Sequence, residues 1–68
     1  MNLRRLEQLI ALAEEGTFVA AAERSHLSQP ALSRSIRKLE QELGVRLFER
    51  DRHGAVLTPA GRRLLDRA

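Results

Sequence analysis

The apolar positions in the first part of the chain recur at the spacing of a helix. They form one stripe, on the alternation of three and four residues that places side chains on a common helical face. The stripe consists of Leu3, Leu6, Leu9, Ile10 and Ala13. Asn2 is a favourable N-cap before it, and Gly16 is a common helix terminator after it. The pattern therefore predicts a helix over residues 3–15, with Leu12 off the stripe and available for a contact with something else.

A second and shorter helix is predicted in the segment "FVAAAERS", residues 18–25. Thr17 precedes it as an N-cap, and its run of alanines lets another helix approach closely. The turn that follows contains no glycine, but His26 is a residue type that tolerates the left-handed backbone conformation. Leu27 comes next and is expected to fill the core beneath this turn.

The third predicted helix is capped by Ser28, carries Pro30 in its first turn, where a missing N–H costs little, and ends at Gly44. One narrow apolar stripe runs along it. This stripe consists of Leu32, Ile36, Leu39 and Leu43. The opposite side is polar and partly basic. It carries Pro30, Ser33, Arg34, Arg37 and Gln41, with Gln29 at the N-terminal tip and Lys38 at the edge.

The N-terminal half of that polar side has the properties of a recognition helix. Pro30 and Ser33 are short, so the backbone can approach a partner closely, and base edges in a DNA major groove are read by the first turns of a helix. Gln29 is a residue type that pairs with adenine through two hydrogen bonds, and Arg34 is one that pairs with guanine in the same way. The alternative interpretation is a solvated helix face with a capped N-terminus.

Two short runs compatible with β-strands follow, "VRLFER" and "AVLT", and the segment "DRHG" separates them. Gly54 supplies a turn, so the pattern predicts a hairpin. Arg50, Arg52 and His53 crowd its tip, where they could straddle the DNA backbone or place an Arg in the minor groove. A polar, solvated loop tip is the alternative interpretation.

Thr58 and Pro59 are typical of the N-cap and first residue of a helix, and they predict a last helix that starts at Pro59. Gly61 is unusual inside a helix and is expected to mark a close contact with another helix. The order helix, short helix, turn, helix, hairpin, helix is that of a winged helix-turn-helix. The predicted fold is mainly α, with three helices, a short β-hairpin wing and the start of a further helix.

The length of 68 residues is typical of a single domain with a compact core, and the absence of Cys excludes disulfides and thiolate metal sites. No apolar run is long enough to span a membrane or serve as a secretion signal, so we expect a cytoplasmic protein. The formal charge is −2 over residues 1–23 and +5 over residues 24–68. The later segments are therefore expected to face a polyanion, although solvated surface charges would give the same pattern.

The sequence does not favour catalysis or metal binding. Ser25, His26 and Ser28 are close together in the chain, but a turn in a small helical domain offers no cleft for a nucleophile and its base. His26 and His53 are too few for a metal site and lack partners at ligand spacing. We expect no enzyme, no cofactor and no metal. RNA binding is also disfavoured, because the chain has no Tyr or Trp for base stacking.

The segment "FVAAAERSHLSQPALSRSIRKLEQELGVRLFER" followed by "LTPAG" resembles the N-terminal DNA-binding domain of LysR-type transcriptional regulators of bacteria. The resemblance implies sequence-specific binding to a double-stranded operator, and hence association with the nucleoid when bound. It also implies a DNA-binding domain over residues 1–58, with the helix-turn-helix at about 18–37. Residues 59–68 would be the truncated start of a linker helix through which such proteins form homodimers. A C-terminal domain that binds a small-molecule effector follows in the family.

Carried over to this sequence, the DNA contacts of the family fall into three groups. The major-groove contacts are Gln29, Pro30, Ser33 and Arg34. The DNA-backbone contacts are Thr17, Ser28 and Lys38, to which we add Arg37 on the outer face. The wing and minor-groove contacts are Arg50, Arg52 and His53.

The chain departs from the family at two positions. Many members have a Gly-Arg-Gly wing tip, whereas this tip reads Arg52-His53-Gly54, so Arg52 at a shifted position or His53 would take the place of the minor-groove Arg. Ser35 stands where many relatives have a longer polar residue, which is expected to alter base preference. The rival interpretation of the whole chain is a winged helix that binds protein rather than DNA. Such a module would expose aromatic side chains or a hydrophobic patch on this face.

Overall fold

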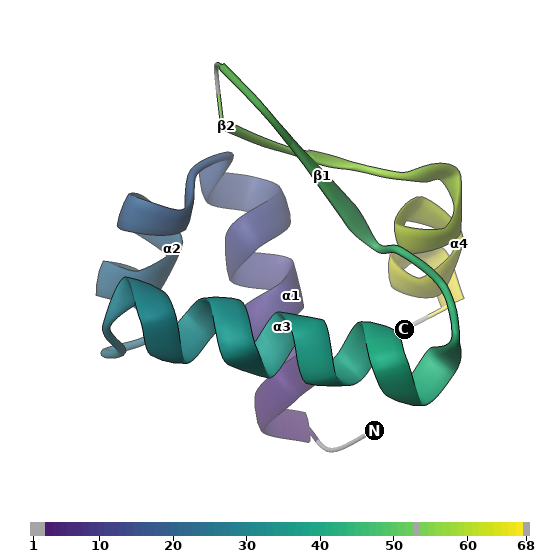
Figure 1. Ribbon diagram of the computed structural model, residues 1–68, viewed down its shortest axis with the longest axis horizontal. Helices are drawn as coiled ribbons and strands as arrows, with labels where there is room; N and C mark the ends of the chain where they lie inside the picture. Colours follow the sequence, from purple (N-terminus) through teal and green to yellow (C-terminus); the bar gives the residue numbers. More distant parts are fainter. Residues whose placement is uncertain (1–2, 53, 68) are drawn as a thin grey trace.

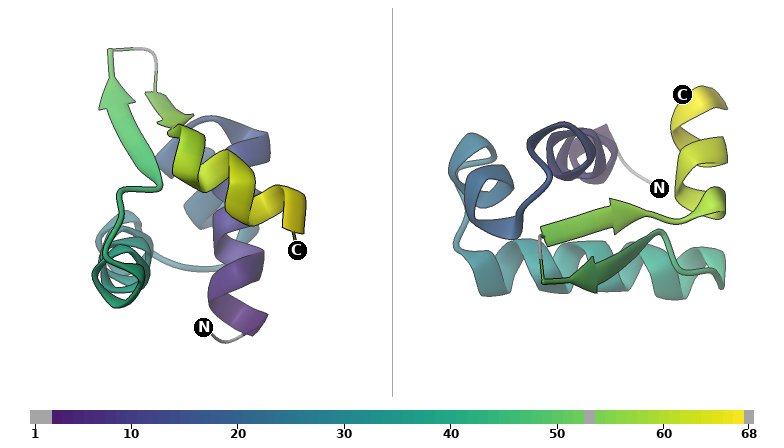
Figure 2. Two further views of the ribbon diagram at one scale, coloured as in Figure 1. Left: turned by 90° about the vertical axis from the view of Figure 1, so that its right-hand side faces the viewer. Right: turned by 90° about the horizontal axis from the view of Figure 1, so that it is seen from above.

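The computed structural model describes residues 3–52 and 54–67 of the chain. Three helices, a two-stranded antiparallel hairpin and a fourth helix follow one another, which confirms the predicted winged helix-turn-helix (Figure 1). The elements are α1 (Leu3–Glu15), α2 (Phe18–Arg24), α3 (Gln29–Leu43), β1 (Phe48–Asp51), β2 (Gly54–Leu57) and α4 (Pro59–Arg67). The hairpin lies over α3, and α2 and α4 flank it at opposite ends (Figure 2).

The starts of α2, α3 and α4 are set by the capping residues that the sequence predicted. The hydroxyl oxygens of Thr17, Ser28 and Thr58 accept hydrogen bonds from backbone N–H groups at 3.2, 3.2 and 3.1 Å, respectively. Each of these bonds satisfies a backbone donor that has no partner inside its helix. The predicted N-cap of α1, Asn2, lies outside the described residues.

The helix ends also follow the prediction, because residues with a left-handed backbone conformation lie where the chain turns. Gly16 after α1 and Gly44 after α3 have φ angles of 80° and 72°. His26 has φ 58° in the turn between α2 and α3, as its residue type allowed. Leu27 follows and packs against the core while remaining partly exposed, so it fills the space beneath the turn as expected.

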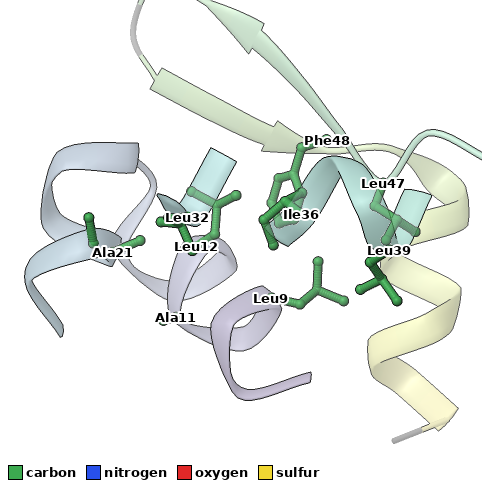
Figure 3. Close-up of a cluster of buried hydrophobic side chains, with 10 residues drawn as sticks. Leu9, Ala11, Leu12, Ala21, Leu32, Ile36, Leu39, Leu47 and Phe48 are labelled. Carbon is green, nitrogen blue, oxygen red and sulfur yellow. The ribbon is translucent and has the colours of Figure 1, made fainter. Parts of the chain in front are cut away.

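The core lies where α1, α2 and α3 cross, and the first residues of the wing close it on one side (Figure 3). Five of its leucine side chains have no solvent exposure, and Ile36 and Phe48 lie beside them at 3% and 5% exposure. The fully buried large residues are Leu9, Leu12, Leu32, Leu39 and Leu47.

Two expectations about the apolar faces were wrong. Leu12, placed off the stripe, is fully buried and belongs to the core, whereas Leu3, placed on the stripe, is 70% exposed. Both α2 and α3 pack against α1, so its buried surface is centred on Leu9 and Leu12, and the first turn extends beyond it. Leu43 is 43% exposed, because the buried stripe of α3 ends at Leu39, before the last helical turn.

The wing is attached to α3 at its base. Its strands pair from Phe48 opposite Leu57 to Asp51 opposite Gly54, so the first strand is shorter than the predicted run that began at residue 45. One carboxylate oxygen of Glu40, in α3, accepts hydrogen bonds from the backbone N–H groups of Leu47 and Phe48, at 2.7 and 3.2 Å. Leu47 lies just before β1, and Phe48 is the first residue of that strand. These two bonds fix where the wing begins relative to α3.

The wing is attached a second time near its tip. The Ala55 backbone N–H donates to the Gly16 carbonyl at 2.8 Å, between α1 and α2. Gly54 has φ 134°, and a Cβ at this position would collide with the same carbonyl oxygen. Glycine is therefore required here both for the backbone conformation and for the close approach.

The start of α4 packs against the segment between α3 and β1. Thr58 donates its hydroxyl to the Arg46 carbonyl at 2.6 Å and its backbone N–H to the Leu47 carbonyl at 3.0 Å. Gly61 is buried, and a Cβ there would meet the Leu47 carbonyl oxygen and the Leu57 side chain. The expected close contact exists, but its partner is this loop and β2 rather than another helix.

Candidate nucleic-acid interface

The outer side of α3 presents the polar and basic side chains that the sequence placed there. Gln29, Pro30 and Arg34 are exposed, and Ser33 is half-buried. Farther along the helix, the side chains of Arg37 and Lys38 are also exposed. The opposite side of the same helix carries the buried apolar stripe. The residues that pack against the core are therefore different from those that face solvent. Because the first turn carries only short residues and one amide, a partner can approach the helix backbone closely there.

A shallow groove joins the tip of α3 to the start of α2 and to the wing. Its volume is about 350 Å³. Residues from all three elements line it, so predicted contacts that are distant in sequence come together. Among them are Thr17, Gln29, Arg50 and Arg52. The remaining predicted wing residue, His53, lies outside the described residues.

A larger cleft of about 570 Å³ separates α3 from β1. Ser33 and Arg37 line it from the helix, and Arg50 lines it from the strand. Arg46, an exposed residue in the loop before β1, contributes a further cation that the sequence analysis did not select. Its position two residues after the helix-ending Gly44 was the available signal, since a residue there must lie near the base of the wing.

The two hollows share a positively charged border. Arg37, Arg46 and Arg50 line the cleft, with Arg52 in the neighbouring groove. The Glu40 carboxylate in the cleft is engaged with backbone N–H groups, which reduces its effect on a bound anion. Glu49 also lines the cleft and Asp51 lines the groove, so the cations there outnumber the carboxylates but are not alone. An excess of cations attracts a polyanion and is the electrostatic pattern of nucleic-acid-binding surfaces.

Arg24 at the end of α2 is engaged elsewhere. Its guanidinium forms ion pairs with Glu14 at 2.7 Å and with Glu15 at 3.2 Å. Hydrogen bonds to Glu14 and then to Glu15 raise the pKa of this already basic group. Its cation is therefore paired within the domain, in contrast to the arginines that line the cleft.

Ser35 faces α1 rather than the outer side of α3, so its position gives no support to the expectation that it alters base preference. It is half-buried, and its hydroxyl donates to the side-chain oxygen of Gln8, which is itself buried in α1. A helix repeat of 3.6 residues turns position 35 away from the side that carries Arg34 and toward α1. This pair is a polar contact between two packed helices.

Metal sites and membrane-spanning helices are also absent from the part of the chain that the structure describes. Among residues 3–52 and 54–67, the His, Cys, Asp and Glu side chains do not form any group of three or more that could hold a metal ion. In that part of the chain, no helix combines the length and apolar character needed to cross a membrane. The fold and the charged hollows beside α3 are those of a winged helix-turn-helix module for nucleic acid.

Comparison with known proteins identifies the family. The sequence model of one protein family matches residues 3–62, and this family is described as bacterial regulatory helix-turn-helix protein, lysR family. The chain therefore belongs to the LysR family, as the resemblance implied. This is a family of DNA-binding transcription regulators and not of enzymes.

Named relatives and a solved structure are similar over almost the whole chain. The DNA-binding transcriptional dual regulator OxyR of Escherichia coli strain K12 is 54% identical over all 68 residues, which cover 22% of that protein. The HTH-type transcriptional regulator TfdS of Cupriavidus pinatubonensis is 53% identical over the same span, 23% of its length. The crystal structure of the CbnR_DBD–DNA complex has 46% identity and a TM-score of 0.92, covering 98% of this chain and 77% of that one. The chain thus spans less than a quarter of the length of each of these two regulators.

Proposed function

We propose that this chain reads a specific sequence in double-stranded DNA by inserting the N-terminal half of α3 into the major groove. The observation that supports this proposal best is the outer face of the N-terminal half of α3, where short side chains and one exposed Arg lie beside a basic wing. This arrangement fits the width of a major groove, which admits one helix, and leaves the wing beside the adjacent backbone and minor groove.

The residues divide into three roles under this proposal. Gln29, Pro30, Ser33 and Arg34 face the bases, with the amide and the guanidinium as the groups able to make two hydrogen bonds to one base. Thr17, Ser28, Arg37 and Lys38 contact phosphates. Arg50, Arg52 and His53 contact the backbone or the minor groove from the wing.

A protein-binding winged helix is less well supported. Such an interface is enriched in exposed aromatic side chains. Here Phe48 is 5% exposed and belongs to the core, and Phe18 is half-buried against it. The face beside α3 instead offers guanidinium groups, which suit phosphate and guanine.

The decisive experiment selects sites from random duplexes and then compares variants on the selected and an unrelated duplex at one stated salt concentration. Arg34→Ala and Gln29→Ala should each reduce discrimination at one base position by roughly 1–3 kcal/mol. Lys38→Ala is the matched control and should weaken binding to both duplexes alike. An equal loss on both duplexes for Arg34→Ala would assign Arg34 to a phosphate and overturn the base-reading role.

We further propose that residues 1–58 form the DNA-binding domain, with the helix-turn-helix at about 18–37, and that residues 59–68 begin a linker helix. In the whole protein, this helix would join a homodimer and lead to a C-terminal domain that takes a small-molecule effector in the cytoplasm. The much greater length of the relatives supports additional domains. In this chain Leu64 and Leu65 are half-buried and pack against the core, which leaves little apolar area for a partner.

Sedimentation velocity at a few micromolar tests the assembly proposal. The 68-residue chain should sediment as a monomer and bind a paired half-site with little cooperativity. A chain extended by the linker helix should gain affinity sharply, because the second half-site is then bound at high effective concentration. A stable dimer of the 68-residue chain without DNA would contradict this assignment of the interface.

A further inference from the structure

Phe18 and Arg50 form a contact that joins the helix-turn-helix to the wing. The Arg50 guanidinium carbon lies 4.2 Å from the centre of the Phe18 ring. Phe18 is the first residue of α2, and its ring packs against the core, whereas Arg50 is an exposed residue of β1. Both residues line the cleft beside α3 and the groove at the tip of the wing. The contact therefore lies where these two hollows meet.

The chemistry of this contact leaves the guanidinium able to bind an anion. A guanidinium stacks on an aromatic ring through its flat face, while its N–H groups point outward in the plane of the group. In the part of the chain that the structure describes, Arg50 forms no ion pair with a carboxylate. The ring therefore fixes the position of the cation without consuming the donors that would bind phosphate.

The contact with the ring also reduces the side-chain entropy that Arg50 loses when it binds an anion. A free Arg side chain loses much rotamer entropy when it is immobilised completely. A side chain already held against a ring that the core keeps in place loses less of this freedom on binding. A residue that holds a cation in this way improves affinity without touching the ligand.

We propose that Phe18 is a positioning residue for DNA binding, which holds the Arg50 guanidinium ready for a phosphate of the strand that passes between α3 and the wing. This inference rests on the proposed function. If α3 lies in the major groove and the wing lies at the adjacent minor groove, the strand that separates the two grooves must cross the cleft between them. Arg50 stands at that crossing, and its N–H edge is the group that meets the phosphate.

The test is a double-mutant cycle on the 68-residue chain with a selected duplex and an unrelated duplex of equal length. Phe18→Leu keeps an apolar side chain but removes the ring, and should weaken binding to both duplexes by roughly two- to five-fold. Phe18→Tyr keeps the ring and should bind like the original chain. In the Arg50→Ala background, Phe18→Leu should cause no further loss.

Two readouts separate positioning from a general effect on the fold. Phe18→Leu leaves the number of cations unchanged, so the slope of log affinity against log salt should stay constant, whereas Arg50→Ala should flatten it by about 0.9. Ring-current shifts of the Arg50 side-chain protons should be present in the original chain and in Phe18→Tyr. They should vanish in Phe18→Leu.

If Phe18→Leu unfolds the chain, Arg50→Lys carries the test, because it keeps the charge and loses the planar face. It should weaken binding while Phe18 is present and leave the salt slope unchanged. An equal loss from Phe18→Leu with and without Arg50 would overturn the proposal, as would full affinity in Phe18→Leu or in Arg50→Lys. Absence of any selected duplex would instead count against the proposed function.

Discussion

Helix α3 and the wing are held in place by different kinds of contact. Leu32 and Leu39 of α3 are completely buried, so the helix is positioned by apolar packing along one side. The wing contributes mainly Phe48 to the core, and its other attachments include backbone hydrogen bonds to Glu40 and Gly16 and the contact of Arg50 with the Phe18 ring. Damage to α3 should therefore unfold the domain, whereas damage to the wing should leave a folded domain with a displaced wing. Selected substitutions can separate these two outcomes.

The largest effect is expected from the core side of α3. Leu39→Ala should lower the free energy of unfolding by about 2–5 kcal/mol, because it removes a fully buried side chain and leaves a cavity. Leu43→Ala is the matched control on the same helix, where the side chain is 43% exposed, and should cost no more than about 0.5 kcal/mol. Urea denaturation followed by circular dichroism measures both. Similar losses would mean that burial does not distinguish the two positions.

The attachment at the base of the wing should come next. Glu40→Ala leaves the backbone N–H groups of Leu47 and Phe48 without their carboxylate acceptor, and should cost about 1.5–3 kcal/mol. Glu40→Gln keeps one side-chain oxygen that can accept both bonds and should recover much of this loss. Chemical denaturation gives the energies, and amide exchange at Leu47 and Phe48 gives the location. Unchanged exchange in Glu40→Ala would contradict the role of this carboxylate.

A smaller effect on stability is expected at the wing tip. Gly54→Ala requires an unfavourable backbone conformation and places a Cβ against the Gly16 carbonyl, so it should cost on the order of 1–3 kcal/mol, confined to the wing. Gly44→Ala also requires a positive φ but enters open space, which makes it the matched control. Amide exchange of Ala55 should accelerate strongly only in Gly54→Ala. Equal acceleration in both variants would show that the collision is unimportant.

The smallest effect on stability belongs to Arg52, which is exposed beside the tip groove. Arg52→Ala should leave the free energy of unfolding unchanged and flatten the salt dependence of DNA binding by about 0.9, the slope of one phosphate contact. Arg63→Ala on α4 removes an exposed cation away from both hollows and should leave the slope unchanged. An unchanged slope in Arg52→Ala would mean that the tip does not touch DNA.

The features that the sequence predicted correctly depend on neighbouring residues. Thr17, Ser28 and Thr58 cap helices by bonding to N–H groups three residues away, so their role is visible in the local sequence. Gly16 and Gly44 end helices through their own backbone conformation. Gln29, Pro30 and Arg34 of the candidate site are exposed on the outer side of α3 for the same local reason.

The features that were missed depend on contacts between distant segments. Whether Leu12 is buried is decided by how α2 and α3 cross α1, and a single helical wheel does not contain that information. Ser35 meets Gln8 only after α1 and α3 have packed. The contact of the Arg50 guanidinium with the Phe18 ring likewise requires the wing to fold back over the start of α2. Sequence periodicity identifies faces, and tertiary packing decides which neighbour each face meets.

The bond between the Ala55 N–H and the Gly16 carbonyl also has a consequence for the order of folding. It joins segments that are far apart in the chain, with the whole of α2, α3 and β1 between them. Such a contact gains little until the intervening segments are in place, because closing a long loop costs entropy first. The wing should therefore dock last in folding and open first in the native state. DNA that holds the wing closed would slow this first opening, so bound operator should protect the Ala55 amide from exchange.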